Sequence, residues 1–173
     1  NYLDESLNSV INQTYKNWEL IFYDNCSTDK SVNILKKYSD KRIKYFKSKK
    51  KIDLGLARKK ALSKAKGDFI AFLDTDDMWK KNKLNKQLKF FNDEKIGFTI
   101  TNSIFFNKLK SKYFYFSKRN FEKKVFYKLI ENYFISFDTV IIKSIYLKKL
   151  NQMINEKFNI IHDMDLLIRL SDI

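Results

Sequence analysis

The chain has 173 residues, of which 44% are hydrophobic and 16% aromatic, and its formal net charge is +15. This length and apolar content predict one globular domain that buries a sizeable core. All but four of the 35 basic residues are lysines, and proline is absent. The positive charge therefore reflects a bias of the whole chain. We expect attraction to anionic partners such as phosphates, but no nucleic-acid partner.

Cys26 is the single cysteine, so an internal disulfide is excluded. No apolar run approaches the ~20 residues that a membrane-spanning helix needs, and the first residues lack the basic and apolar segments of a signal peptide. The sequence therefore predicts a cytoplasmic protein. Peripheral contact of its lysines with anionic lipid at the inner face of a membrane stays open.

Apolar residues alternate along the chain between helical spacing and short runs, which is typical of a layered α/β domain. Repeated strand and helix units predict a mainly parallel central sheet with right-handed crossovers and helices on both faces. Between 103 and 134 aromatic residues fall in strand-like runs, notably 105–106 and 113–116. Before that region we expect a helix over 2–13, a strand over 18–23, a helix over 32–38 capped from 27–29, a strand over 42–46, a helix over 54–65, a strand over 69–73, a helix over 83–91 and a strand over 97–101.

Three carboxylates, Asp74, Asp76 and Asp77, follow the predicted strand over 69–73. Neighbouring carboxylates repel one another unless one is protonated or a cation lies between them. Their oxygen ligands suit Mg²⁺ or Mn²⁺ that shares its coordination with a phosphate. An acidic turn that ends a strand and caps a helix explains the same residues equally well.

A second polar pair, Asp24 and Asn25, ends the predicted strand over 18–23. In an open α/β sheet, ligands bind outside the carboxyl ends of the strands. Groups distant in sequence are therefore expected to converge on one crevice, and this coincidence favours a binding site over a simple acidic turn.

Segments in this order and spacing resemble glycosyltransferase family 2, the inverting nucleotide-sugar transferases of the GT-A fold. Residues 2–15 resemble the first helix of that family, and 18–29 resemble the strand that leads into its D-D-G-S-T-D. Further segments are similar to its G-x-x-x-A-R-N-x-A helix (55–67), its D-S-D-D-x-W-x-P-x-K-L-x-x-Q motif (73–88) and, more weakly, its later segments (136–142 and 162–170), the last of which resembles E-D-x-D-L-x-x-R-L.

The resemblance implies a Rossmann-like GT-A domain over 1–173 that transfers a sugar, with inversion, from a nucleotide-diphosphate sugar to a glycan or lipid-linked acceptor. Its setting would be surface polysaccharide assembly at the cytoplasmic face of the membrane. Carried over by position, the resemblance implies that Asp76 and Asp77 hold the divalent cation, Mn²⁺ or Mg²⁺, that Asp24, Asn25, Arg58, Asp74 and Asp76 bind the donor, and that Asp163 is the catalytic base.

The sequence also departs from the family pattern. The family opens with a strand of S-V-I-I-P-x-Y-N type, and this sequence begins after it, so we expect a single domain cut at its N-terminus and also at its C-terminus. Asn25 stands where the family commonly has a second Asp, Cys26 replaces the usual Gly, and His162 stands where Glu or Asp often precedes the catalytic Asp.

Two alternatives stay open. A phosphohydrolase of the haloacid dehalogenase type also places D-x-D after an apolar strand, with the first Asp as nucleophile, and Asp74-Thr75-Asp76 fits that pattern. Met78 and the position of the motif in mid-chain count against it. A non-enzymatic anion-binding domain would explain the charge of +15, and its binding would depend steeply on salt and not on divalent metal.

Overall fold

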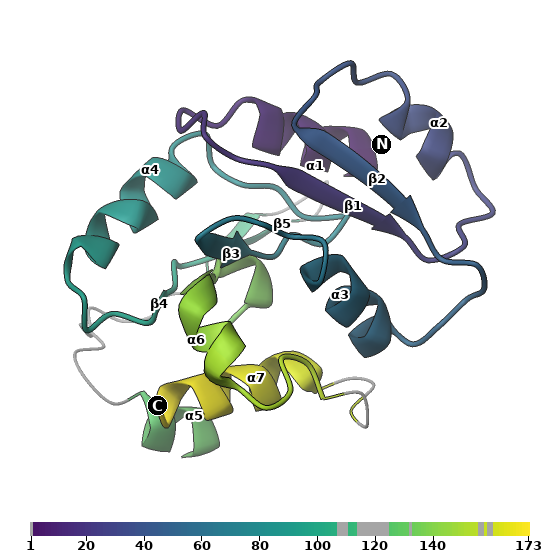
Figure 1. Cartoon of the computed structure of the whole chain (residues 1–173). Coiled ribbons are helices and arrows are strands. Elements are labelled where there is room, and N and C mark those ends of the chain that lie inside the picture. Colours follow the sequence, from purple (N-terminus) through teal and green to yellow (C-terminus); the bar gives the residue numbers. More distant parts are fainter. Residues whose placement is uncertain (1, 107–110, 114–124, 132, 156–157, 159–160) are drawn as a thin grey trace.

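The computed structural model describes residues 2–106, 111–113, 125–131, 133–155, 158 and 161–173. Helices and strands alternate along the first two thirds of the chain, and helices predominate in the last third (Figure 1). This order agrees with the α/β class that the sequence predicts.

The first part of the chain forms a parallel pair of strands with three helices around it. β1 (Leu20–Asp24) pairs in parallel with β2 (Ile43–Lys47). The helices α1 (Tyr2–Ile11) and α2 (Ser31–Leu35) pack against this pair, and α3 (Leu54–Leu62) contacts β1. The predicted order is confirmed, although α2 ends at Leu35 and is shorter than predicted.

The next part contains a three-stranded sheet. β7 (Ile141–Lys143) lies between β3 (Phe69–Ala71) and β4 (Phe98–Thr99) and runs antiparallel to both. β3 and β4 therefore point in the same direction, and β7 departs from the mainly parallel pairing that the sequence predicts. Ile141 and Ile142 are almost fully buried, and the central position gives the backbone of this strand hydrogen-bonding partners on both edges.

Helices flank these strands. The predicted helix over 83–91 divides into α4 (Lys83–Leu88) and the 3₁₀ turn η1 (Lys89–Asn92). A second 3₁₀ turn, η2 (Phe137–Thr139), leads directly into β7, and α6 (Ser144–Lys149) follows it.

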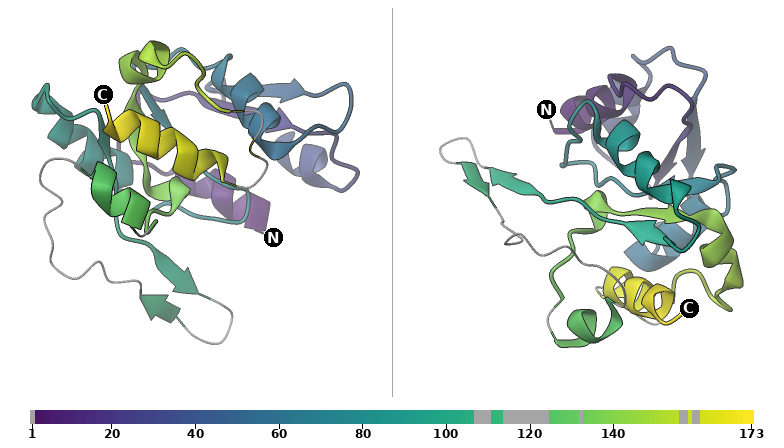
Figure 2. Two further views of the ribbon diagram at one scale, coloured as in Figure 1. Left: turned by 90° about the horizontal axis from the view of Figure 1, so that it is seen from below. Right: turned by 90° about the vertical axis from the view of Figure 1, so that its left-hand side faces the viewer.

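Two of the strand-like aromatic runs form an antiparallel hairpin of β5 (Ile104–Phe106) and β6 (Ser111–Tyr113), which projects from the body of the domain (Figure 2). The rest of the predicted run, 114–116, lies outside the described residues. The helices α5 (Phe126–Glu131) and α7 (His162–Ser171) pack together at the opposite end from β1 and β2 (Figure 1).

The largest hydrophobic cluster lies between β7 and the helices α5 and α7. Its centre consists of side chains with no exposed area, namely Leu129, Val140, Ile142, Ile154, Leu166 and Leu167. Leu166, Leu167 and Leu170 form the apolar stripe of α7, so burial of this stripe fixes where the first turn of α7 lies.

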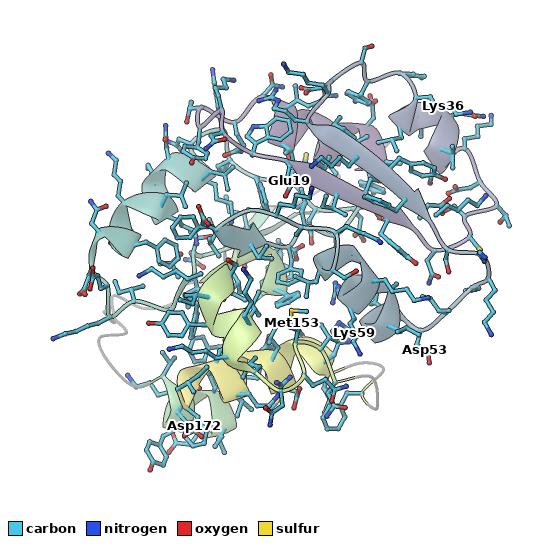
Figure 3. The ribbon with its side chains drawn as sticks, viewed as in Figure 1. Glu19, Lys36, Asp53, Lys59, Met153 and Asp172 are labelled. Carbon is cyan, nitrogen blue, oxygen red and sulfur yellow. The ribbon has the colours of Figure 1, made fainter. Side chains whose placement is uncertain are left out.

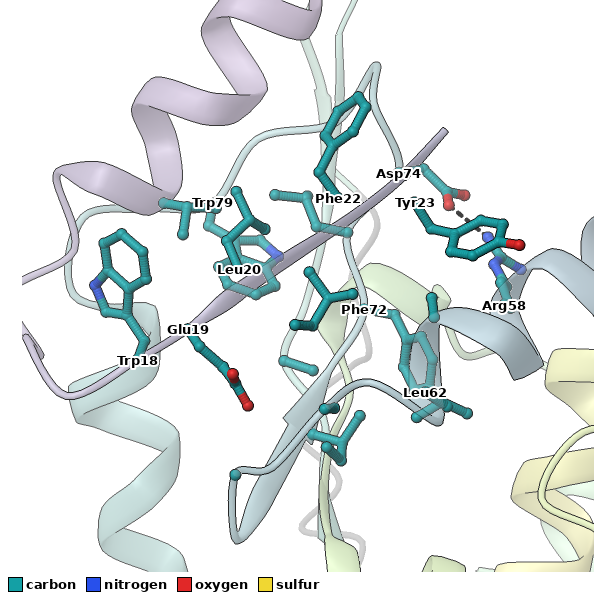
Figure 4. Close-up of a pocket in the computed structure, with 18 of the residues that line it drawn as sticks. Trp18, Glu19, Leu20, Phe22, Tyr23, Arg58, Leu62, Phe72, Asp74 and Trp79 are labelled. Carbon is teal, nitrogen blue, oxygen red and sulfur yellow. Dashed lines mark hydrogen bonds and ion pairs between the residues drawn. The ribbon is translucent and has the colours of Figure 1, made fainter. Parts of the chain in front are cut away.

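A cavity of about 880 Å³ lies between the pair of β1 and β2 and the three-stranded sheet. Residues 20–23 of β1 line one side, residues 69–73 line the other, and side chains of α1 and α3 contribute to its walls (Figure 4). Among the described residues, β1 pairs only with β2, and β3 pairs only with β7. Each of these strands therefore has a second edge that is free to accept another strand.

Candidate functional site

Asp24 lies at the carboxyl end of β1 and is almost fully buried, with 2% of its surface exposed. Its Oδ1 accepts a hydrogen bond from the Ser27 backbone N–H (2.7 Å), and its Oδ2 accepts one from the Tyr45 hydroxyl (2.8 Å). Burial alone would raise the pKa of Asp24, but these hydrogen bonds outweigh burial and the pKa is lowered. Asp24 is therefore an anion that the protein holds in a fixed orientation.

Asn25 joins the end of β1 to the loop before α3. Its Nδ2 donates to the Ile52 carbonyl (2.6 Å), and its Oδ1 accepts from the Ile52 N–H (3.0 Å). The next residue, Cys26, has a φ of 63°, which is the left-handed region that glycine adopts without strain. This backbone conformation gives a physical reason for the glycine that the family pattern has at this position.

Arg58 extends from α3 and connects two segments of the site. Its Nη2 forms an ion pair with Asp74 Oδ1, and its Nη1 lies 2.5 Å from His162 Nε2 at the start of α7. Its guanidinium carbon also lies 5.2 Å from the centroid of the Phe137 ring. Figure 4 shows the pair of Arg58 and Asp74 at one end of the cavity, with Trp18 and Glu19 at the other end.

The structure brings together three carboxylates, from Asp74, Asp77 and Asp138. One oxygen of each lies within 4.8 Å of the others. Asp138 belongs to η2, and its Oδ1 accepts a hydrogen bond from the Asp74 N–H (2.7 Å) while its backbone carbonyl accepts one from Trp79 Nε1 (2.9 Å). Asp138 therefore fixes both ends of the loop that carries the aspartates.

The pKa of Asp138 is higher than that of an ordinary carboxyl group. Burial raises its pKa, the hydrogen bond from the Asp74 N–H opposes that rise, and the charges of Asp74 and Asp77 add to it, so that the pKa of Asp138 is about 7. A carboxyl group that is crowded in this way gains from a cation, which displaces the proton and relieves the repulsion.

Asp76 lies outside this carboxylate cluster. It is exposed and lines both the main cavity and a smaller hollow of about 470 Å³ near the start of α2. The two residues that the resemblance assigns to the cation thus occupy different positions, because Asp77 belongs to the cluster and Asp76 faces the cavity.

Asp163 lies in the first turn of α7, where its Oδ2 accepts a hydrogen bond from the Tyr133 hydroxyl (3.1 Å). The neighbouring residue, His162, is 1% exposed and contacts Arg58. Gly55 permits this close approach of α3 to α7, because a Cβ at Gly55 would lie 3.1 Å from the Phe158 carbonyl oxygen and 3.7 Å from the His162 ring.

The cavity gathers four of the predicted donor-binding residues in one place, since Asn25, Arg58, Asp74 and Asp76 all line it. Asp24 is buried beneath the end of β1, and Asp163 is connected to the cavity through His162 and Arg58. Sequence reasoning did not give Asp138 or Tyr133 a role. The weak similarity over 136–142 was the available signal for Asp138, and no signal pointed to Tyr133.

Acidic side chains at the carboxyl ends of two strands, beside a cavity and a carboxylate cluster, lie where open α/β domains bind their ligands. Residues 1–151 match the model of the family described as Glycosyl transferase family 2. The chain therefore belongs to glycosyl transferase family 2.

Curated relatives of the chain include bacterial glycosyltransferases. The chain is 41% identical over 102 residues to the putative teichuronic acid biosynthesis glycosyltransferase TuaG of Bacillus subtilis, covering 58% of this chain and 40% of TuaG. It is also 41% identical over 97 residues to the UDP-Glc:alpha-D-GlcNAc-diphosphoundecaprenol beta-1,3-glucosyltransferase WfaP of Escherichia coli, covering 56% of this chain and 39% of WfaP. The chain thus spans less than half the length of either relative.

Solved structures share the fold. The chain superimposes on residues 1–349 of TarS from S. aureus with a TM-score of 0.71 at 24% identity, covering 98% of this chain and 51% of that one. It superimposes on the mannosyltransferase PcManGT of Pyrobaculum calidifontis, solved with GDP-Man and Mn²⁺, with a TM-score of 0.72 at 16% identity, covering 98% and 48%. These likenesses confirm the predicted GT-A fold.

The comparisons favour the glycosyltransferase interpretation over the two alternatives. Neither the phosphohydrolase of the haloacid dehalogenase type nor the anion-binding domain gains support from the family match. Within the described ranges, no helix combines the length and apolar character that crossing a bilayer requires.

Proposed function

We propose that the protein transfers a sugar from a nucleotide-diphosphate sugar to a glycan or lipid-linked acceptor, with inversion at the anomeric carbon. The convergence of Asn25, Arg58, Asp74 and Asp76 on one cavity carries this proposal. Relatives and neighbours support it, because WfaP is named for UDP-Glc and a diphosphoundecaprenol acceptor and TarS is solved with UDP and UDP-GlcNAc. A lipid-linked acceptor would bring the protein to the inner face of a membrane, where its lysines favour anionic lipid.

We infer that the site takes Mn²⁺ or Mg²⁺. The donor set fits such a hard cation, because Asp74, Asp77 and Asp138 each offer a carboxylate oxygen within 4.8 Å of the others and oxygen ligands suit these ions. Asp76, at the cavity, would contribute from the side of the donor diphosphate. When bound, the cation supplies charge neutralisation for the diphosphate leaving group.

Asp163 is proposed as the general base. Its carboxylate would accept the proton of the acceptor hydroxyl as that oxygen attacks the anomeric carbon from the face opposite the diphosphate, and this single displacement inverts the configuration. Arg58 contacts both Asp74 and His162, the residue before Asp163. It therefore holds the donor end of the site in a fixed position relative to the base.

We also propose that, in the active protein, an additional extended segment occupies the apolar part of the cavity between β1 and β3 and leaves the end at Arg58 and Asp74 open to the donor. Both strands have an unpaired edge there among the described residues, and the cavity is lined largely by apolar side chains, including Leu20, Phe22 and Ile70. An inserted strand would satisfy both edges and join the pair of β1 and β2 to the three-stranded sheet. Adding a strand of the S-V-I-I type before the first helix should then strengthen nucleotide binding in the titration below.

Calorimetric titration with UDP, GDP and dTDP, each with Mn²⁺ and with EDTA, tests the donor site. We expect metal-dependent binding of one nucleotide, weakened about 100-fold in an Asp74→Asn/Asp77→Asn double variant. Asp172→Asn, at the end of α7 away from the cavity (Figure 3), is the matched control and should bind normally. Equal binding in Mn²⁺ and EDTA, or none with the added strand in place, would contradict the proposal.

The base is tested separately by Asp163→Asn. This variant should bind the nucleotide with unchanged affinity and lose transfer by at least about 100-fold, because the general base is removed while the donor site is intact. Consumption of radiolabelled donor measures the loss. Transfer at the rate of the unmodified protein would remove Asp163 from this role.

A further inference from the structure

A half-buried tyrosine contacts the proposed base. Tyr133 lies between α5 and η2, where its ring is half-buried against the main hydrophobic cluster. Its hydroxyl donates a hydrogen bond to Asp163 Oδ2 at 3.1 Å. The two residues are 30 positions apart in the chain, so their contact is a product of the packing of α5 against α7.

The Tyr133 hydroxyl keeps its proton and so can always donate a hydrogen bond to Asp163. Burial, the negative charge of Asp163 and the hydrogen bond itself raise the pKa of Tyr133 well above its ordinary value, against a smaller lowering effect of Arg58. A tyrosine in this environment keeps its proton throughout the physiological pH range. Asp163 Oδ2 is therefore the acceptor in this bond at every pH where the carboxylate is ionised.

An unconstrained aspartate rotates readily about its terminal torsion, because the energy wells for a carboxylate are broad and roughly two-fold. A hydrogen bond to one oxygen restricts that rotation and leaves the other oxygen, Oδ1, to face a reacting hydroxyl. A base that holds its productive orientation loses less entropy on the way to the transition state.

We propose that Tyr133 is a positioning residue, whose hydroxyl orients the Asp163 carboxylate so that Oδ1 is presented to the acceptor. This inference rests on the proposed function of Asp163. It differs from a packing role of the tyrosine ring, because it assigns the effect to the hydroxyl group alone.

The Tyr133→Phe variant tests the proposal because it retains the ring and removes only the hydroxyl. We expect kcat for transfer to fall about 10-fold, the effect of one hydrogen bond to a charged group, while the KM for the donor and the affinity for the nucleotide stay unchanged. Tyr38→Phe is the matched control, since the Tyr38 hydroxyl also donates to an aspartate, Asp4 Oδ1 in α1, at 2.6 Å. This control should leave kcat and KM unchanged.

A double-variant cycle on stability gives a readout that does not depend on activity. Urea denaturation of the unmodified chain, Tyr133→Phe, Asp163→Ala and the double variant should reveal a coupling of about 10-fold in the unfolding equilibrium constant. Absence of coupling would overturn the proposal, as would an unchanged kcat in Tyr133→Phe or an equal loss in Tyr38→Phe. If Tyr133 and Asp163 are coupled in stability but the unmodified protein does not turn over any donor, the hydrogen bond is supported and the proposed function is contradicted.

Discussion

Lys83, the first residue of α4, is a buried lysine. The side chain is 7% exposed, and no donor or acceptor of the described residues pairs with its Nζ. Nζ lies 4.4 Å from the centroid of the Trp79 ring. Burial lowers the pKa of Lys83 from 10.5 to about 7, and the charge of Asp138 opposes this only in part. We therefore expect Lys83→Met to stabilise the protein at neutral pH.

The magnitude follows from the difference between the folded and unfolded pKa. A fall in the pKa of Lys83 from 10.5 to about 7 means that the charged lysine lowers the free energy of unfolding by about 5 kcal/mol. The fall in pKa already includes the opposing attraction to Asp138. The attraction of the cation to the indole ring, which Met would forfeit, offsets about 2 kcal/mol of the loss. The expected net gain for Lys83→Met is about 3 kcal/mol at pH 7 and below.

The pH dependence has a definite sign. Between pH 7 and 10.5 the unfolded chain binds a proton at Lys83 that the folded chain has released, so stability of the unmodified protein rises with pH through this window. The gain from Lys83→Met should therefore be largest below pH 7 and vanish near pH 10.5.

Urea denaturation at pH 6.5 and pH 10, in the presence of EDTA, measures both quantities. Lys86→Met is the matched control, because Lys86 belongs to the same helix and is exposed, and it should change stability by less than about 0.5 kcal/mol at either pH. A Lys83→Met protein that is less stable than the unmodified one at pH 6.5, or a gain that is equal at the two pH values, would refute the reasoning.

Two further predictions concern tight contacts around the site. Gly55→Ala should destabilise the protein by about 1 kcal/mol in urea denaturation, because the added Cβ would lie 3.1 Å from the Phe158 carbonyl oxygen and we expect displacement of this backbone atom to cost more than the gain in helix propensity. It should also slow transfer by displacing the start of α7, and a more stable, fully active variant would contradict the close approach. Gln13→Ala should cost about 2 kcal/mol, because the fully buried Gln13 amide donates to the Ser9 and Lys80 carbonyls at 2.9 Å and accepts from the Leu84 N–H. A thermal unfolding midpoint equal to that of the unmodified chain would show that these hydrogen bonds contribute nothing.

Much of the fold could be predicted because its signals are local. The apolar stripe of α1 and the short apolar run of β1 each reveal their element within a few residues, since burial of one face imposes the period of a helix or strand. β7 was not predicted as a strand. Its three residues, Ile141–Lys143, are too few to show a period, and its antiparallel position between β3 and β4 depends on partners more than 40 residues away.

The residues of the candidate site also fall into those that local sequence predicts and those that it does not. Asp74, Asp76 and Asp77 could be identified because they follow an apolar strand in a recognisable motif, whereas Asp138 lies 64 positions from Asp74, whose N–H it binds. Arg58 was expected to bind the donor and lines the cavity, but its contacts with Asp74 and His162 could not be predicted. Side-chain pairing of this kind depends on distances across the fold that no local pattern contains.

The sequence by itself determined the α/β class, the order of the elements up to β4, the family and the loop that carries the aspartates, because periodicity and short motifs encode these features locally. The tertiary structure alone decided which carboxylates form the cluster, that Tyr133 contacts Asp163 and that Lys83 is buried against Trp79. The physical reason is that hydrogen bonds, repulsion between charges and burial act between atoms a few ångströms apart. Only the packed chain brings those atoms together.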